Sequence, residues 1–405
     1  MPAQPTGDQA PPDGRLPEEA TASLGTRPFG VYVHVPFCAT RCGYCDFNTY
    51  TADELGTTPG ASRAGWADAV LAEWRIAREG LGASRPPVDT VFFGGGTPTR
   101  LPPADLLRVL DALRADPGLA ADAEVSVEAN PETLTRDLLA ALRAGGVTRL
   151  SMGMQSASEH VLAVLDRVHS PGRVAAAVAD ARAVGFDSVS LDLIYGTPGE
   201  SLDDWRHTLD VTVGLEPEHV SAYALIVEPG TRLAGRVARG EVAAPDDDAM
   251  ASMYETADDV LRGAGLQWYE ISNWARAPRL RSRHNMHYWS DTDWWGLGPG
   301  AHSHVGGVRW WNVKHPAAWS QRLGEGASPA AARETLDAAT RRLERVMLGV
   351  RTVDGAAVAD VQASVGPQAL ARLDGLVDDG LVQPAPLRSG RVVLTRRGRL
   401  LADAV

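Results

Sequence analysis

Cysteine is scarce in this sequence. Only three of the 405 residues are cysteine, and all three lie in the short segment HVPFCATRCGYCDF. An odd number of cysteines at such close spacing does not build a disulfide framework. Long apolar runs are missing too, because segments such as VSAYALIV at 220–227 fall far short of the roughly 20 residues that span a bilayer. We therefore expect neither a disulfide-stabilised secreted domain nor an integral membrane protein.

Positive charge is also in deficit. The chain has 39 lysine and arginine residues against 51 aspartate and glutamate residues, a net charge of −12. This balance argues against nucleic-acid binding through bulk charge. The first residues, MPAQPTGDQAPPDGRLPEE, lack the basic start and apolar centre of a signal peptide, so we expect a cytoplasmic protein. The 44% hydrophobic content excludes disorder throughout, and the length predicts two or three domains.

Short β-rich segments alternate with helical segments in the first half of the chain. Residues 1–26, rich in proline and acids, are expected to form a disordered leader, and residues 27–230 the main domain. Strands alternating with helices predict an α/β fold with a parallel sheet, and six such units suit a complete or partial barrel. The expected strands are 30–35, 88–93, 124–129, 148–153, 188–194 and 219–226, and the expected helices are 62–79, 103–115, 133–144, 158–165, 172–184 and 202–213.

The second half has a different composition. Eight of the eleven tryptophans lie between Trp268 and Trp319, so residues 231–325 are interpreted as an aromatic-rich α+β extension. Residues 335–405 read as helices with a β-hairpin between them, which predicts a winged-helix-like C-terminal domain. Arginines at 391, 396, 397 and 399 would be its basic patch for DNA. Nearby acids argue against DNA binding, and we expect a packing or partner surface there instead.

The cysteine spacing indicates a metal centre. Three thiolates from one loop, Cys38, Cys42 and Cys45, can hold three irons of a [4Fe–4S] cluster and leave the fourth iron open to an exchangeable ligand. Zinc is the alternative, with His34 as a fourth ligand, and three incidental cysteines are the third interpretation. The spacing favours the cluster.

Further unusual residues follow the predicted strands, at the end where parallel barrels gather their ligand-binding groups. A glycine run at 94–96 precedes Thr97, and its backbone could approach a ligand closely or simply form a tight turn. Glu128 could bind a ligand or cap a helix, and Asp192 could bind one or form a structural ion pair. Gln155 and Arg167 follow the fourth strand.

A CxxxCxxC loop after the first strand, with Tyr44 before the last cysteine, resembles the radical S-adenosylmethionine (SAM) superfamily. The resemblance implies a radical-SAM-type partial (β/α)6 barrel. It also implies that the amino and carboxylate groups of SAM chelate the open iron, and that an electron from the cluster can cleave SAM to a 5′-deoxyadenosyl radical. The implied SAM contacts are Tyr32, Tyr44, Gly95, Gly96, Thr97, Glu128, Gln155, Arg167, Asp192 and Ala224.

Longer motifs resemble one branch of that superfamily. YVHVPFC, GGGTPT, VEANPE, MGMQS and DLIYGTPGE are similar to segments of the branch that holds oxygen-independent coproporphyrinogen III dehydrogenases and heme chaperones. The dehydrogenase pattern has a fourth cysteine two residues after the third, where this chain has Phe47. The segment HNMHYW at 284–289 matches the HNxxYW motif that the chaperone branch carries and that is implicated there in heme binding.

The chemistry of HNMHYW suits a porphyrin. Imidazole from His284 or His287 could ligate heme iron, and Tyr288 and Trp289 offer flat apolar faces. Arginines at 279, 281 and 283 could meet propionates. The alternative is an aromatic core or domain interface. The resemblance implies heme contacts at His284, Asn285, Tyr288 and Trp289, whereas His302 and His304 are interpreted as ordinary loop residues.

These features predict a binding and delivery protein rather than an enzyme. It would be a heme chaperone that carries one [4Fe–4S] cluster and an exchangeable SAM and passes heme to an acceptor protein, including one bound to a membrane. The alternative is a dehydrogenase that decarboxylates coproporphyrinogen III, and a third option is a radical SAM enzyme with another substrate. The oligomeric state is left open, with a homodimer among the alternatives.

Overall fold

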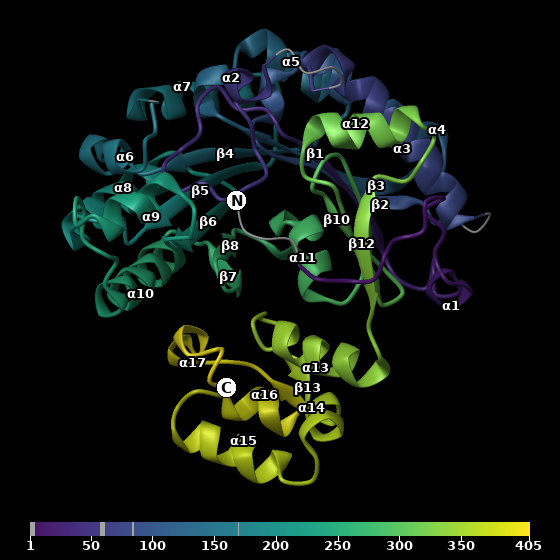
Figure 1. Ribbon diagram of the computed structural model, residues 1–405. Helices are drawn as coiled ribbons and strands as arrows, with labels where there is room; N and C mark the ends of the chain where they lie inside the picture. The colour runs from purple at the N-terminus through teal and green to yellow at the C-terminus, as the bar shows by residue number, and fades with distance from the viewer. Residues whose placement is uncertain (1–4, 57–60, 83–84, 169) are drawn as a thin grey trace.

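The computed structural model describes residues 5–56, 61–82, 85–168 and 170–405, and a twelve-stranded sheet forms its centre. Six neighbouring strands pair in parallel and correspond to the six predicted from the sequence. Figure 1 shows the sheet as an arch with helices on its outer side, which confirms the predicted partial barrel. The strands are β1 (Phe29–Val35), β2 (Val88–Gly95), β3 (Leu119–Ala129), β4 (Arg149–Gln155), β5 (Val189–Tyr195) and β6 (His219–Ala224).

The helices on the outer side cover the apolar face of these strands. In the longest of the six, Trp66, Val70, Trp74, Ala77 and Leu81 recur at helical spacing and are buried. That spacing places them on one face of the helix, which is why the segment is helical and packs on the sheet. The helices are α3 (Trp66–Leu81), α4 (Pro103–Ala115), α5 (Arg136–Ala144), α6 (Glu159–Val164), α7 (Pro171–Ala183) and α8 (Leu202–Gly214).

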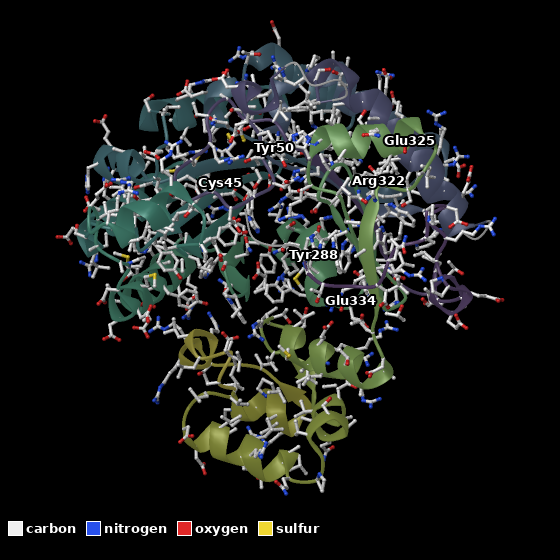
Figure 2. The ribbon with its side chains drawn as sticks, in the orientation of Figure 1. Cys45, Tyr50, Tyr288, Arg322, Glu325 and Glu334 are labelled. Atoms are coloured by element: carbon white, nitrogen blue, oxygen red, sulfur yellow. The ribbon has the colours of Figure 1, made fainter. Side chains whose placement is uncertain are left out.

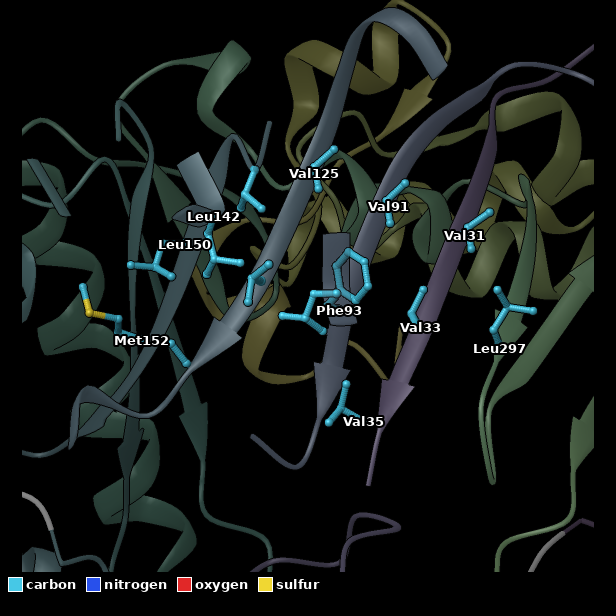
Figure 3. Packing of buried hydrophobic residues seen from close by; sticks show 14 of the residues in the cluster. Val31, Val33, Val35, Val91, Phe93, Val125, Leu142, Leu150, Met152 and Leu297 are labelled. Carbon is cyan, nitrogen blue, oxygen red and sulfur yellow. The ribbon is translucent and has the colours of Figure 1, made fainter. Parts of the chain in front are cut away.

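Alternation along each strand separates a core face from an inner face. Val31, Val33 and Val35 of β1 are fully buried, and Figure 3 shows them packed beside β2 residues Val91 and Phe93. Full burial of such a side chain contributes roughly 1.5–3 kcal/mol to folding. The residues between them point to the inner side of the arch, because successive side chains of a strand alternate between its two faces. The inner face is therefore free to carry polar groups.

The aromatic-rich segment extends the barrel sheet at both edges, since β9 pairs in parallel with β1 and β8 pairs antiparallel with β6. The bounds 231–325 expected for this segment stay a prediction. The added elements are α9 (Arg232–Ala238), α10 (Asp247–Gly263), β7 (Gln267–Glu270), β8 (Asn273–Ala275), α11 (Arg283–Trp289), β9 (Asp293–Leu297), β10 (His302–Val305), β11 (Val308–Asn312), α12 (Pro316–Gly324) and β12 (Ala330–Thr335).

Helix α11, which carries HNMHYW, lies inside the arch rather than among the outer helices (Figure 1). Ser282 caps its start by accepting a hydrogen bond from the Asn285 backbone N–H at 3.3 Å. The ring of His284 stacks on Phe92 of β2, with centroids 5.2 Å apart. The helix therefore packs against the inner face of the sheet.

The N-terminal segment differs from the disordered leader that was expected. In residues 5–26 the Asp8 backbone N–H donates to the Arg333 carbonyl at 2.8 Å, which pairs this segment with β12. Ala20 in the short helix α1 (Glu18–Thr21) and Leu24 are buried in the main core. Backbone pairing does not depend on side-chain type, so the polar composition gave no sign of it. Residues 1–4 lie outside the described residues.

The C-terminal residues form a smaller unit with its own apolar cluster around Val350, Leu373 and Leu394. Figure 1 shows it below the open side of the arch. The strand pair in it is antiparallel, and the winged-helix-like assignment stays a prediction. Its elements are α13 (Ala338–Gly349), β13 (Ala356–Ala357), α14 (Val358–Val365), α15 (Ala369–Asp378), α16 (Pro384–Arg388), β14 (Arg391–Val392) and α17 (Arg396–Leu400).

The arginines of α17 attach the C-terminal unit to the barrel. Arg399 donates to Asp258 of α10 at 3.3 Å, and its guanidinium lies 3.6 Å above the Trp268 ring. Arg396 pairs with Asp259. These contacts agree with the packing surface expected from the sequence. None of the helices in the described part of the chain has both the length and the apolar character that crossing a membrane requires.

Candidate functional site

The loop that carries the three cysteines follows β1 and is held at several points. The Cys38 backbone N–H donates to the Tyr50 carbonyl at 3.0 Å. Gly43 donates to the Leu165 carbonyl and accepts from the Leu233 N–H. A Cβ at position 43 would come within 2.6 Å of the Asp166 carboxylate, so a larger residue there would require that side chain to move. The loop is thereby closed over the end of the barrel.

Tyr44 anchors the middle of the loop. Its ring packs against the apolar cluster that includes Leu165, Ile194 and Leu225 at the ends of the fourth to sixth barrel units. Burial and the neighbouring Cys42 thiol raise the pKa of the Tyr44 hydroxyl. The aromatic in the cysteine motif therefore fixes the position of its neighbours through packing.

The three cysteines are partly accessible and lie beside a cation. The Arg167 Nη1 donates to the Cys42 Sγ at 3.5 Å, and its Nη2 donates to the Gly153 carbonyl at 2.7 Å. Burial raises the pKa of the Cys38 thiol, and it raises that of Cys45 to about 11. The buried Nε of Arg167 has no partner among the described residues. Three thiols beside a guanidinium with a free donor fit an anionic iron–sulfur group.

The zinc interpretation loses its fourth ligand in the structure. His34 is buried, and its Nε2 donates to the Asn48 carbonyl at 2.8 Å while its Nδ1 is hydrogen-bonded to the Tyr32 hydroxyl at 2.9 Å. Both ring nitrogens are thus engaged. Within the described ranges, no group of three or more His, Cys, Asp or Glu side chains is placed to hold a single metal ion. His34 is therefore not placed as a fourth zinc ligand.

The glycine run after β2 packs against the cysteine loop. Gly96 donates to the Val35 carbonyl at 2.8 Å, and a Cβ there would lie 2.7 Å from the Phe37 carbonyl oxygen. The Thr97 backbone N–H donates to the same Phe37 carbonyl. Its hydroxyl is hydrogen-bonded to the Cys38 thiol and lowers the pKa of that thiol, but burial raises the same pKa by more. In this structure the glycines serve the contact between two loops.

Two partly buried carboxylates lie at the inner face of the sheet. Glu128 accepts a hydrogen bond from the Gly95 N–H at 2.9 Å, so the helix-capping alternative does not apply. Burial and the charge of Asp192 raise the pKa of Glu128 to about 8. Both carboxylate oxygens of Asp192 accept from the Ser151 hydroxyl, at 3.0 and 2.9 Å, and burial raises its pKa. These acids are pre-positioned acceptors for ligand hydroxyl or amino groups.

Other residues that the resemblance implied lie at the same ends of the strands. Gln155 adopts a left-handed φ of 64° beside a register shift between β4 and β5. A left-handed non-glycine residue next to a bulge is a common feature of functional sites. Ala224 ends β6 opposite Tyr195 and is half-buried. Arg167, which was expected to clamp a carboxylate, instead bridges Gly153 and Cys42.

A cavity of about 490 Å³ opens on the inner side of the arch. This volume lies within the range of roughly 300–1,000 Å³ that is usual for ligand sites. Figure 2 shows Cys45 and Tyr288, from distant parts of the chain, both within the arch. The lining comprises Tyr32, His34, Phe47, Asn48, Gly95, Glu128, Tyr288, Trp294, Gly300, Ala301 and His302. The cavity therefore joins three expected SAM contacts with Phe47 and one residue of HNMHYW.

The histidines of HNMHYW are not presented to the cavity as ligands. His284 is 1% exposed, its Nδ1 is hydrogen-bonded to the Thr90 hydroxyl at 2.7 Å, and its Nε2 to the Tyr288 hydroxyl at 2.8 Å. His287 is also buried, and its Nε2 donates to the Asp89 carboxylate at 3.0 Å. The pair orients Tyr288 and fixes the helix to β2. This geometry differs from the expected role of either imidazole as a ligand of heme iron.

The other polar residues in and beside the motif differ in their contacts. Asn285 donates from its side chain to the Glu270 carboxylate at 2.7 Å, away from the cavity lining. Trp289 is partly buried, and its indole Nε1 has no partner within the described residues. Arg283 pairs with Asp89 and Asp122, so its charge is already balanced. Tyr288 is the member of HNMHYW that lines the cavity.

Sequence reasoning missed the contribution of the β9–β10 region to the site. Trp294, Gly300, Ala301 and His302 line the cavity because β9 pairs with β1, far away in sequence. The Asn48 amide fixes this arrangement by donating to the Pro299 and Lys314 carbonyls, at 2.9 Å each. The GPGAHS segment offered a signal, since a run with two glycines is typical of a close approach between backbones.

Comparison with known proteins gives a consistent result. Residues 32–212 match the radical SAM superfamily. The chain is 52% identical over 385 residues to a heme chaperone HemW of Mycobacterium tuberculosis, with 95% of each chain covered. It is 33% identical to the heme chaperone HemW of Bacillus subtilis, over 92% of this chain and 97% of that protein.

A solved structure matches almost the whole molecule. Coproporphyrinogen III oxidase (HemN) from Escherichia coli, described as a radical SAM enzyme, superposes with a TM-score of 0.80. The match covers 95% of this chain and 90% of the enzyme at 26% sequence identity. The fold is thus similar to that of an enzyme, whereas the sequence is more similar to those of heme chaperones. Because one fold can carry different functions, the two functions have to be distinguished by the residues of the site.

Proposed function

This chain belongs to the HemW family of the radical SAM superfamily, and from that premise we propose that it is a heme chaperone which binds heme in the cavity inside the arch and transfers it to an acceptor protein. The observation that carries this proposal is that Phe47 and Tyr288 line the same cavity. These residues belong to the two sequence features that separate a chaperone from a dehydrogenase. Their convergence supports a function for both features in one ligand site.

The composition of the cavity wall suits a porphyrin. Phe47 is 59% exposed and lines the cavity, so its ring is accessible to a ligand. Trp294 and Tyr288 stand edge to face with ring centroids 4.9 Å apart. Such aromatic surfaces gain free energy by covering a flat apolar macrocycle. A macrocycle held against these rings would also remove Phe47 from water.

Cys38, Cys42 and Cys45 are the residues proposed to hold the [4Fe–4S] cluster. The cluster would supply an open iron at which SAM exchanges and, when reduced, an electron. Arg167 supplies positive charge to the thiolates, and Glu128 and Asp192 supply acceptors at the ends of the third and fifth strands. Binding of SAM next to the heme cavity would let the two ligands influence each other.

The competing function is oxidative decarboxylation of coproporphyrinogen III, which the likeness to HemN keeps in consideration. A dehydrogenase would decarboxylate propionates of its porphyrinogen substrate, whereas a chaperone would release its heme chemically unchanged. We expect that anaerobic incubation of the cluster-loaded protein with coproporphyrinogen III, reductant and SAM leaves the propionates intact when the porphyrins are separated by chromatography. Formation of protoporphyrinogen in multiple turnovers would overturn the chaperone assignment.

A further inference from the structure

The cavity contains one histidine that the internal hydrogen bonds leave available. His302 begins β10 at the cavity wall and is exposed to it. Its ring lies against Trp311, with centroids 5.9 Å apart and planes 27° apart. Across the ranges that the structure describes, no group is hydrogen-bonded to the His302 imidazole. Both ring nitrogens of the other histidine in the lining, His34, are engaged.

The HNMHYW histidines are poorer candidates for iron ligation. To ligate iron, His284 would have to give up a hydrogen bond to Thr90 or to Tyr288 and leave a site where it is 1% exposed. Breaking a buried hydrogen bond and leaving its partner unsatisfied is unfavourable. His302 gives up no such bond. The free-energy difference favours ligation from β10.

The surroundings of His302 keep the ring neutral. Burial, followed by the positive charges of Lys314 and Arg309, lowers the pKa of His302. A neutral imidazole is the form that ligates iron. Arg309 is itself paired with Glu334 and Glu344.

We propose that His302 is the protein ligand of heme iron in this cavity, with Phe47 and Tyr288 against the macrocycle, and that the HNMHYW histidines act by positioning Tyr288. This inference rests on the proposed heme chaperone function. It assigns the iron ligand to a residue outside the motif from which heme binding was first inferred. His302 and Phe47 are brought together because Asn48 ties the cysteine loop to the β9–β10 turn.

The test is a titration of the cluster-loaded protein with hemin, followed by absorbance in the Soret region, for wild type and for His302→Ala. We expect wild type to show an imidazole-ligated spectrum. His302→Ala should lose that spectrum and bind hemin at least about tenfold more weakly, a difference of about 1.4 kcal/mol. Added free imidazole should restore the ligated spectrum of the variant. His207→Ala, which removes an exposed histidine of α8, is the control and should match wild type.

His302→Met covers the case in which His302→Ala does not fold. It keeps a ligand of similar length and should shift the spectrum from imidazole to thioether ligation. Two results would overturn the assignment while leaving the chaperone function intact. One is an unchanged spectrum and hemin affinity in His302→Ala. The other is loss of the imidazole spectrum in His284→Gln but not in His302→Ala. Failure of wild type to bind hemin at all would overturn the proposed function itself and the assignment with it.

Discussion

The side-chain amide of Asn48 donates a hydrogen bond to the Pro299 carbonyl, 2.9 Å away, and a second to the Lys314 carbonyl. Asn48 lies three residues after the last cysteine, and Pro299 lies three residues before His302. One side chain thus joins the cysteine loop to the segment that completes the cavity. The distance between the proposed cluster and the proposed heme site depends on this contact.

Removal of the Asn48 amide should destabilise the protein. Asn48→Ala removes the side-chain donor to the Pro299 carbonyl and the shorter of two hydrogen bonds to the Lys314 carbonyl, and we expect a loss of about 1–3 kcal/mol in the free energy of unfolding, measured by urea denaturation. Tyr50→Phe is the matched comparison, because it removes only the weaker bond to the Asn48 side-chain oxygen, at 3.2 Å, and that to the Lys314 carbonyl, at 3.4 Å. A loss in Asn48→Ala no greater than that in Tyr50→Phe would contradict the linking role.

The metal content distinguishes the cluster from zinc. After anaerobic reconstitution we expect about four irons per chain, because three thiolates on one loop can hold a cubane cluster. Substitution of Cys38, Cys42 or Cys45 by alanine should each lower the iron content to near zero, as measured by elemental analysis. One zinc per chain with little iron, in protein purified without oxygen, would be incompatible with the proposed centre.

The order of the barrel strands could be predicted from the sequence, whereas most of the cavity wall could not. Val31, Val33 and Val35 alternate with polar residues, and this local pattern predicts a strand with one buried face. By contrast, the placement of His302 depends on the pairing of Gly30 with Trp294, a contact between residues far apart in the chain. Pairings of this kind leave no local periodicity, so His302 was interpreted as an ordinary loop residue.

Motif resemblance located the site but not the role of each residue in it. HNMHYW was interpreted as a heme contact with its iron ligand left open, and only the structure shows that Thr90 and Asp89 engage its histidines. The sequence left open whether the glycine run approaches a ligand or forms a tight turn; in the structure Gly96 packs against the carbonyls of Val35 and Phe37, while Gly95 lines the cavity. The role of a motif residue depends on its hydrogen-bond partners, which come from other strands. The spacing of residues within the motif does not reveal those partners.

The titration of Glu128 should make stability depend on pH. Its pKa in the folded protein is about 8, whereas an unfolded glutamate titrates near about 4.3. Between these values the unfolded chain binds fewer protons than the folded chain, so Glu128 lowers the free energy of unfolding as the pH rises from about 4.3 to about 8. Glu128→Gln removes this loss and keeps an acceptor for the Gly95 N–H.

We therefore expect Glu128→Gln to gain stability relative to wild type between about pH 5 and about pH 8, as measured by urea denaturation at both values. Glu159→Gln changes an exposed carboxylate at the start of α6 and is the control. Its free energy of unfolding should differ from that of wild type by the same amount at both pH values. A Glu128→Gln difference that stays constant with pH would show that this carboxylate does not have a raised pKa.

Phe47 should contribute to heme affinity through its exposed ring. Phe47→Ala removes an aromatic face from the cavity, and we expect the hemin affinity to fall by about 1–3 kcal/mol, while Phe47→Tyr should retain most of it. Val168→Ala removes another exposed apolar side chain, 74% exposed, that is not in the cavity lining, and should bind like wild type. Equal hemin affinity in Phe47→Ala and wild type would remove Phe47 from the heme site.

The stoichiometry of hemin binding tests the central claim most directly. Hemin is titrated into the full-length, cluster-loaded protein under anaerobic conditions, and the Soret absorbance is followed to saturation. The proposed cavity inside the arch predicts a saturable change with its break at an equimolar ratio of hemin to chain. A signal that rises without saturation, as for hemin adsorbed on protein surfaces, would contradict a heme chaperone function.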